Sequence, residues 1–290
     1  MNVLEELGLP RLPEALPRPV ADNHTHLDTT TEYSGLQPAD SLRLAAQVGV
    51  SRVVQVGCDV ASSRFAVELA NREPTVVATV ALHPNDAART FLSGGQPALT
   101  AELQALRPLA SAAGVRAIGE TGLDHYRTRE PEGRRAQEES FRWHIALARE
   151  LDLTLVVHDR DAHADVLRVI DDEGAPARVV MHCFSGDVDF AQECLERGFW
   201  LSYPGVVTFA SAENLREAAE ITPLEKVLVE TDAPFLTPKP ERGKHNAPYL
   251  LPHTVRFLAE LLDVELVQFC DAVLANTFAA FGGPWGEPDA

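Results

Sequence analysis

Hydrophobic and polar positions along the chain follow two alternating patterns. Short, nearly continuous apolar runs rich in β-branched residues predict strands at 20–23, 52–56, 75–82, 115–119, 153–157, 178–181, 199–202 and 226–229. Longer stretches between them have apolar residues at helical spacing, at 39–48, 62–71, 134–150, 162–171 and 187–197. Strands that are apolar throughout and alternate with helices are typical of a parallel sheet covered by helices.

Eight such strand–helix units predict an α/β protein with the (β/α)8 TIM-barrel fold. A doubly wound open sheet is the alternative, but no Gly-x-Gly-x-x-Gly motif follows a predicted strand. We expect an irregular N-terminal lead-in at 1–19, a single barrel domain at 20–280 and a loose C-terminal tail at 281–290. Polar residues that follow the strands of a barrel converge on its C-terminal mouth, where active sites lie.

Composition narrows the class of protein. The chain has 290 residues, of which 45% are apolar, and this excludes disordered and fibrous proteins. The 25 Lys and Arg against 43 Asp and Glu give a net charge of −18, the wrong sign for gripping long nucleic acid. The four cysteines form no Cys-x-x-Cys pair, which indicates reduced thiols in the core. The chain has no basic leader or long apolar run, so we expect a cytoplasmic protein without a membrane segment.

Candidate metal ligands stand directly after the predicted strands. His24 and His26 are two residues apart on an extended segment, so both imidazoles point to the same side. Four further candidates follow later apolar runs: Glu120, His158, His182 and Asp232. Burying such a cluster would be costly unless it coordinated something.

Six ligands exceed the four that one tetrahedral ion uses, so the sequence predicts two divalent metal ions. We expect His24, His26 and Asp232 around one ion, His158 and His182 around the other, and Glu120 as a bridge. The mixture of imidazole and carboxylate suits Zn, Mn, Fe or Co, with Mg as a further candidate, and leaves the metal open.

The order of these motifs resembles a known family. The chain is similar to the TatD-type metal-dependent deoxyribonucleases, of the amidohydrolase-like superfamily, from about residue 20 to Phe278. The motifs that carry the resemblance are His24-x-His26-Leu27-Asp28, Leu82-His83-Pro84, Ile118-Gly119-Glu120-Thr121-Gly122-Leu123-Asp124, His158-x-Arg160-x-Ala162, His182-Cys183-Phe184-Ser185-Gly186 and Glu230-Thr231-Asp232-Ala233-Pro234-Phe235-Leu236. The resemblance implies a (β/α)8 barrel, a divalent-metal site at the six residues, and hydrolysis of DNA phosphodiesters from a strand end.

The predicted metal site, together with what the resemblance implies, leads us to expect a metal-dependent hydrolase that acts as an exonuclease on single-stranded DNA ends through a water activated by two metal ions. Asp232 is the expected general base, and Glu120 holds the two ions apart. The acidic net charge fits a short end bound in a cleft better than a long duplex. The alternatives are an ester or amide hydrolase, such as an aminoacyl-tRNA deacylase, and a non-catalytic metal-binding scaffold.

Substrate contacts are less clearly marked in the sequence. His83 could contact a substrate phosphate or cap a helix, and Arg160 could clamp a phosphate beside the metals. Asn246, in the long loop after the last strand, is a third candidate contact or part of a solvated loop. We expect Cys183 to face the core, because neighbouring residues on a strand point to opposite sides.

Overall fold

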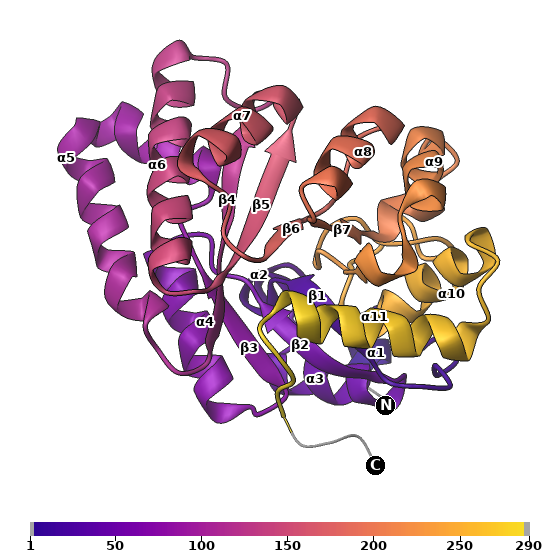
Figure 1. Cartoon of the computed structure of the whole chain (residues 1–290). Coiled ribbons are helices and arrows are strands. Elements are labelled where there is room, and N and C mark those ends of the chain that lie inside the picture. Colours follow the sequence, from indigo (N-terminus) through magenta and orange to yellow (C-terminus); the bar gives the residue numbers. More distant parts are fainter. Residues whose placement is uncertain (1–2, 287–290) are drawn as a thin grey trace.

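Residues 3–286, the part of the chain that the computed structural model describes, form a near-closed barrel of eight parallel strands (Figure 1). Neighbouring strands follow the chain order: β1 (Val20–Thr25), β2 (Val50–Gln55), β3 (Val76–Val80), β4 (Val115–Asp124), β5 (Thr154–Arg160), β6 (Val179–Met181), β7 (Trp200–Tyr203) and β8 (Val227–Val229). The ring closes where Thr25 bridges to Ala233, just after β8, and where the His26 N–H donates to the Ala233 carbonyl at 2.9 Å. The predicted (β/α)8 fold is confirmed.

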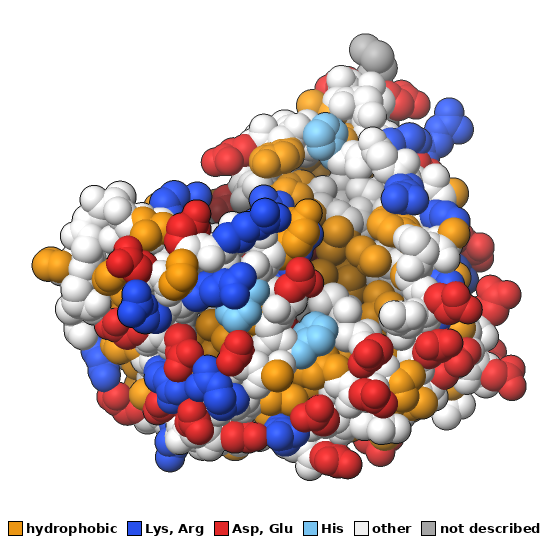
Figure 2. Space-filling model, turned by 90° about the horizontal axis from the view of Figure 1, so that it is seen from above, with side chains coloured by type: hydrophobic (Ala, Val, Ile, Leu, Met, Phe, Trp, Pro, Cys, Tyr) orange, Lys and Arg blue, Asp and Glu red, His pale blue; other side chains and the backbone are white. Residues whose placement is uncertain are grey.

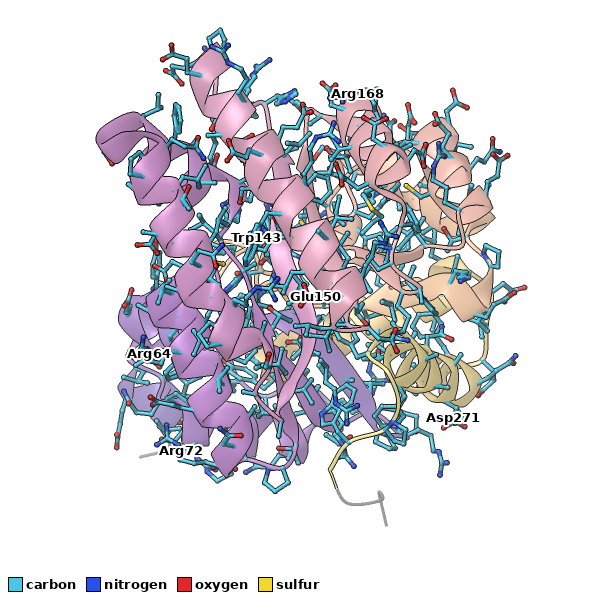
Figure 3. The ribbon with its side chains drawn as sticks, turned by 60° about the vertical axis from the view of Figure 1, so that its left-hand side comes forward. Arg64, Arg72, Trp143, Glu150, Arg168 and Asp271 are labelled. Carbon is cyan, nitrogen blue, oxygen red and sulfur yellow. The ribbon has the colours of Figure 1, made fainter. Side chains whose placement is uncertain are left out.

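Helices cover the outside of the barrel. They are α1 (Val3–Glu6), α2 (Leu27–Ser34), α3 (Pro38–Gln47), α4 (Val60–Arg72), α5 (Pro84–Ala110), α6 (Pro131–Glu150), α7 (His163–Glu173), α8 (Val188–Glu196), α9 (Glu213–Ile221), α10 (Leu251–Leu261) and α11 (Leu266–Ala280), with short 3-10 turns η1 (Gly205–Thr208), η2 (Leu224–Lys226) and η3 (Pro248–Leu250). Figure 3 shows charged side chains such as Arg64, Arg168 and Asp271 on the outer faces of these helices. Within residues 3–286, none of the helices has the length and apolar character that crossing a bilayer requires.

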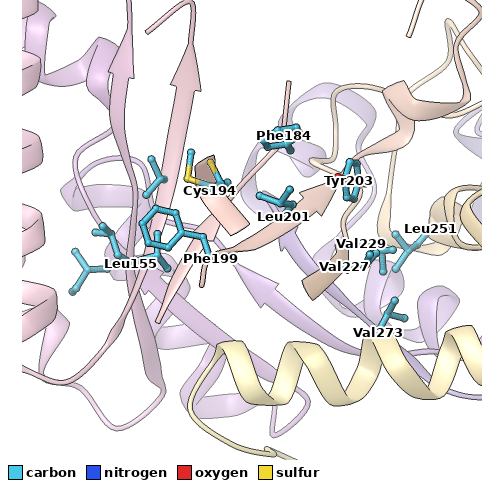
Figure 4. Close-up of a cluster of buried hydrophobic side chains, with 14 of the residues drawn as sticks. Leu155, Phe184, Cys194, Phe199, Leu201, Tyr203, Val227, Val229, Leu251 and Val273 are labelled. Carbon is cyan, nitrogen blue, oxygen red and sulfur yellow. The ribbon is translucent and has the colours of Figure 1, made fainter. Parts of the chain in front are cut away.

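The strands bury both of their faces. One set of alternating residues forms a cluster that fills the barrel, made of Val54, Val77, Ala117, Val156, Val180 and Leu228. The residues between them pack outward against the helices, as Figure 4 shows for Val227 and Val229 beside Leu251 and Val273. This double burial explains why the strands read as continuous apolar runs in the sequence.

The segment after α11 closes the lower end of the barrel and corrects the expectation of a loose tail from residue 281. Phe281 is fully buried and Trp285 nearly so, and both join the cluster that fills the barrel. The Trp285 indole N–H donates to the Thr75 carbonyl at 3.1 Å, and the Arg52 guanidinium donates to the Trp285 carbonyl at 2.8 Å. The rest of the expected tail, 287–290, lies outside the described residues.

We expect Phe281→Ala to lower the free energy of unfolding by about 3–5 kcal/mol, the usual cost of removing a buried Phe side chain. Denaturant unfolding followed by circular dichroism measures the change. Val267→Ala, at a side chain 40% exposed on α11, is the control and should be nearly neutral. If the two variants unfold alike, the segment after α11 does not close the barrel.

Strands β4 and β5 extend further than expected. They were predicted to end at residues 119 and 157, but they stay paired to Asp124 and Arg160, so Glu120 and His158 lie within strands. Between Ile118 and Thr121, β4 has one residue more than the facing part of β5, which is a bulge at Gly119–Glu120. A Cβ on Gly119 would collide with Val156, so glycine allows the two strands to approach here.

Candidate metal centre

Glu120 lies at the centre of a cluster of imidazoles at the C-terminal mouth of the barrel. Its Oε1 atom faces three ring nitrogens, Nδ1 of His158 at 2.6 Å, Nε2 of His182 at 3.3 Å and Nε2 of His83 at 3.4 Å. The carboxylate is almost fully buried. The three imidazoles that face this oxygen therefore come from the C-terminal ends of β3, β5 and β6.

The other oxygen of Glu120 faces a second group. Nε2 of His24 lies 3.5 Å from Oε2, and Nε2 of His26 lies 3.9 Å from it. Oδ1 of Asp232 completes this group, at 3.5 Å from His26 Nε2 and 3.9 Å from His24 Nε2. The structure thus brings the six candidate ligands together around Glu120, with His158 and His182 facing one of its oxygens and His24 and His26 facing the other.

The donor atoms suit divalent metal ions. His24 is fully buried, and within residues 3–286 neither of its ring nitrogens has a hydrogen-bond partner. Its ring stacks on that of His182 with the centroids 3.4 Å apart. Unpartnered buried imidazole nitrogens are costly unless they bind a ligand, and imidazole with carboxylate is a common donor set for Zn and similar ions. The ligand atoms of His24, His26 and Asp232 lie within 4.8 Å of one another.

Burial and charge set the protonation of the cluster. Burial opposes ionisation of Glu120, but the surrounding imidazoles, His182 and His83 foremost, outweigh it and hold the pKa of Glu120 well below its usual range. Burial likewise disfavours a charged His182, but the carboxylates of Glu230 and Glu120 raise the pKa of His182 well above its usual value. A metal ion would displace such protons, so ion binding at this cluster depends on pH.

Glu230 is a buried carboxylate that sequence reasoning missed. Its Oε1 lies 3.0 Å from Nδ1 of His182 and accepts the Cys183 N–H at 2.9 Å. Its Oε2 accepts the hydroxyl of Ser202, which in turn accepts the Asn23 amide at 2.7 Å. A carboxylate on the far nitrogen of a ligand imidazole fixes the ring orientation and its tautomer. The available signal was an acidic residue directly after the apolar run of β8.

We expect Glu230→Gln to weaken metal binding by about 10- to 100-fold, as loss of such an outer partner usually does. Gln keeps the size of the side chain but removes the negative charge that faces His182. Metal titration of the chelated protein at fixed pH measures the affinity, and Glu225→Gln, an exposed position on η2, is the matched control. Equal affinities in the two variants would contradict a positioning role for Glu230.

Asp124 orients His158 in a similar way from β4. Its Oδ2 atom lies 3.4 Å from Nε2 of His158 and accepts the amide of Asn85 at 2.9 Å. Burial alone would lower the pKa of His158, but the bonds to Asp124 and Glu120 outweigh it and raise the pKa of His158 to about 9. Both ring nitrogens of His158 therefore face carboxylates.

His83 has the capping role that the sequence left open, and its ring also faces the cavity. Its Nδ1 accepts the Asn85 N–H at 3.1 Å and so caps α5, while its Nε2 faces Glu120 in the cavity. Because Nδ1 accepts a hydrogen bond, the neutral ring carries its proton on Nε2. Burial lowers the pKa of His83, which favours that neutral ring.

Arg160 and Asn246 differ in position. Arg160 is exposed at the rim, where its guanidinium lies 4.2 Å over the ring of Tyr126. Asn246 was a candidate substrate contact, but it is 1% exposed and its amide donates to the carbonyls of Thr231 at 2.9 Å and Phe235 at 2.6 Å. We therefore assign Asn246 to holding the loop after β8 and not to contacting a ligand.

All four cysteines are free, but two of them lie at the mouth and not in the core. Cys58 is half-buried, with Sγ 3.8 Å from Oε2 of Glu120. Cys183 was expected to face the core; instead it lines the same cavity. The reason is that β6 ends at Met181 and Cys183 has a φ of 45°, so strand alternation has already stopped.

The cluster lies at the bottom of an open cavity of about 570 Å³. Figure 2, which views the molecule from above, shows this hollow with apolar side chains within it and basic and histidine side chains beside it. Besides the ligands, the walls include Arg127 and Arg160 on one side and Val206, Phe235 and Leu236 on another. A cavity of this size can hold a small molecule or the end of a polymer chain, but it is too small for a long stretch of polymer.

Known proteins are similar to this chain over nearly its whole length. The model of the family described as TatD related DNase matches residues 21–282. A Mycobacterium tuberculosis protein named "uncharacterized metal-dependent hydrolase TatD" is 42% identical over 274 residues, 92% of this chain and 99% of that protein. YcfH of Escherichia coli K12, also named as a metal-dependent hydrolase, is 36% identical over 260 residues, 89% of this chain and 93% of that one. The crystal structure of YJJV, a TatD homolog of Escherichia coli K12, superposes with a TM-score of 0.81 at 26% identity, covering 91% of this chain and 98% of that one.

A barrel with an imidazole and carboxylate cluster at its mouth, together with these relatives, defines a metal-dependent hydrolase. The chain belongs to the TatD-related DNase family, which confirms the resemblance seen in its motifs.

Proposed function

We propose that the protein hydrolyses phosphodiester bonds of DNA and shortens single strands from an end. The observation that supports the proposal is the central position of Glu120, with one oxygen facing His158 and His182 and the other facing His24. The net charge of −18 and the open cavity of about 570 Å³ favour a short, single-stranded end over a long duplex.

The six candidate ligands would hold about two divalent ions, with Zn, Mn or Mg as candidates. We assign His24, His26 and Asp232 to one ion, His158 and His182 to the other, and Glu120 to both. When bound, such ions lower the pKa of water and neutralise charge on a phosphate.

Asp232 is the general base in this proposal. Burial opposes its ionisation, but the hydrogen bond from His26 and the nearby imidazoles outweigh it and lower the pKa of Asp232. The carboxylate is therefore ionised at neutral pH and able to take a proton. Its side chain is 13% exposed and lines the cavity, so it is accessible to an attacking water.

Two side chains would bind the phosphate. Within residues 3–286 the guanidinium of Arg160 has no carboxylate within 4 Å, so its donors are free for a phosphate group. The Nε2–H of His83 points into the cavity and is a second donor. Both lie on the β3 to β5 side of the mouth.

The test is a substrate screen with and without a chelator. End-labelled single strands, duplexes, circular single strands and aminoacyl-tRNA are the substrates. We expect a ladder that shortens from one end, faster on single strands than on duplexes, intact circles, and no reaction after chelation. Nicked circles would contradict end-directed cleavage, and deacylated tRNA with intact DNA would establish the ester hydrolase instead.

The Arg160→Ala variant further distinguishes hydrolysis of DNA from hydrolysis of an ester. On DNA we expect kcat/KM to fall by about 10- to 100-fold, the usual effect of losing a hydrogen bond to a charged group. Arg168→Ala, on the outer face of α7, is the control (Figure 3). A hydrolase acting on an uncharged ester would show no difference between the two variants.

A further inference from the structure

Three aromatic side chains are exposed around the mouth of the barrel. Tyr33 is 57% exposed, Tyr126 is 50% exposed and Phe235 is 44% exposed. Phe235 lines the cavity, Tyr33 contacts Phe235, and Tyr126 contacts Arg160 at the rim. Large rings normally bury most of their surface, so exposed rings gathered at one site indicate contact with a ligand.

These rings lie on opposite sides of the cavity. Phe235 follows β8 and Tyr33 lies in the last turn of α2, the helix after β1, and β8 and β1 are neighbours where the barrel closes. Tyr126 follows β4, next to β5 with Arg160. In a ring of eight strands these two pairs face each other across the mouth. The metal cluster lies between an apolar side and a basic side.

The two sides differ in what already covers the rings. The Arg160 guanidinium lies 4.2 Å over the ring of Tyr126 and so covers one face of that ring. Among the described residues 3–286, Phe235 has only edge contacts with other rings, to Tyr33 at 5.8 Å and 79° and to His26 at 6.5 Å and 64°. Val206 and Leu236 extend the apolar wall beside it. Phe235 is therefore the ring best placed to stack on a planar ligand.

The backbone around Phe235 is fixed relative to the catalytic carboxylate. The Phe235 N–H donates to the Asp232 carbonyl at 2.9 Å. The buried amide of Asn246 donates to the carbonyls of Phe235 and Thr231, one on each side of Asp232. The turn therefore holds Phe235 in place before a ligand binds. Because Phe235 contacts His26, a base stacked on Phe235 would lie next to the metal cluster.

We propose that Phe235, supported by Tyr33, is a stacking subsite for an unpaired nucleobase next to the phosphate that is cleaved. The proposal rests on the proposed function and adds the side of the cavity that recognises the base. The phosphate would face Arg160 on the basic side, while the base lies on the apolar side. Bases in a duplex already stack on their neighbours, so this subsite selects single-stranded or frayed ends.

Two substrates separate stacking from backbone contacts. One is an oligothymidylate, and the other is an abasic strand of the same length and charge built from tetrahydrofuran phosphodiesters. For Phe235→Leu we expect kcat/KM on oligothymidylate to fall by about 5- to 100-fold, the loss expected for one base–aromatic stack. The abasic strand should be cut equally by this variant and the wild type, because it has no base to stack.

Tyr126→Leu is the matched control, because it removes a similarly exposed ring on the basic side. This variant should affect both strands to the same degree, since Tyr126 acts through Arg160 on the backbone. Phe235→Trp should restore the preference for oligothymidylate. A Phe235→Leu variant with wild-type preference would overturn the stacking subsite.

A binding measurement keeps the test independent of hydrolysis. In Phe235→Trp we expect oligothymidylate to quench the added indole fluorescence and the abasic strand to leave it unchanged, with the wild type as the background. Quenching without hydrolysis in any variant would refute the proposed nuclease activity and retain the base subsite. Hydrolysis with no quenching and no change in preference would retain the nuclease activity and refute the subsite.

Discussion

Asp232→Asn should lower turnover of single-stranded DNA by at least about 100-fold, the smaller end of what general base catalysis supplies. Asn keeps the shape of the side chain and one oxygen near His26, but it cannot accept a proton. Bound metal should fall much less than turnover, because the other ligands of the cluster are unchanged. Elemental analysis and single-turnover hydrolysis on the same samples measure both effects.

Asp271→Asn, an exposed position on α11, is the matched control for this change (Figure 3). It should leave both metal content and turnover at wild-type values. His24→Ala gives the contrasting result, since it should lower metal content first and recover part of its turnover in excess metal. Near-normal turnover of Asp232→Asn with full metal would place the base at another residue.

Glu120→Gln should reduce bound metal in both groups of ligands together. The carboxylate faces His24 with one oxygen and His158 with the other. Neutralising it therefore weakens the electrostatic attraction for a cation at both groups of ligands. We expect a loss of metal affinity larger than the about 10- to 100-fold that an outer partner costs. Equilibrium dialysis with elemental analysis measures the number of ions per chain and their affinities.

The control for Glu120→Gln is Glu132→Gln, in the exposed first turn of α6. This variant should bind metal as the wild type does. If Glu120→Gln loses one ion and keeps the other at unchanged affinity, Glu120 belongs to one group alone and the bridging assignment is wrong.

The pattern of apolar runs was enough to predict the barrel, because each strand is buried on both faces. The same logic placed His24, Glu120 and His182 at one mouth, since the carboxyl ends of parallel strands converge there. Local sequence could not predict where the strands end. The pairing of β4 with β5 continues to Asp124, and that extension is a tertiary effect.

The errors have a common physical cause, which is that side-chain direction outside regular elements depends on backbone geometry. Cys183 lies in a left-handed turn just after β6, and therefore faces the cavity. Asn246 points inward because its amide donates to two backbone carbonyls. It lies in an irregular loop, where hydrophobic periodicity does not predict side-chain direction. Phe281 was assigned to a loose tail because the space it fills at the end of the barrel exists only after the strands close.

The dependence of hydrolysis on two bound metal ions is best measured by a metal titration of the chelated wild-type protein, with bound metal and hydrolysis of an end-labelled single strand followed in the same samples. We expect about two ions to bind per chain and hydrolysis to rise with their binding. Hydrolysis at full rate with no bound metal, or saturation at a single ion with full activity, would contradict this dependence.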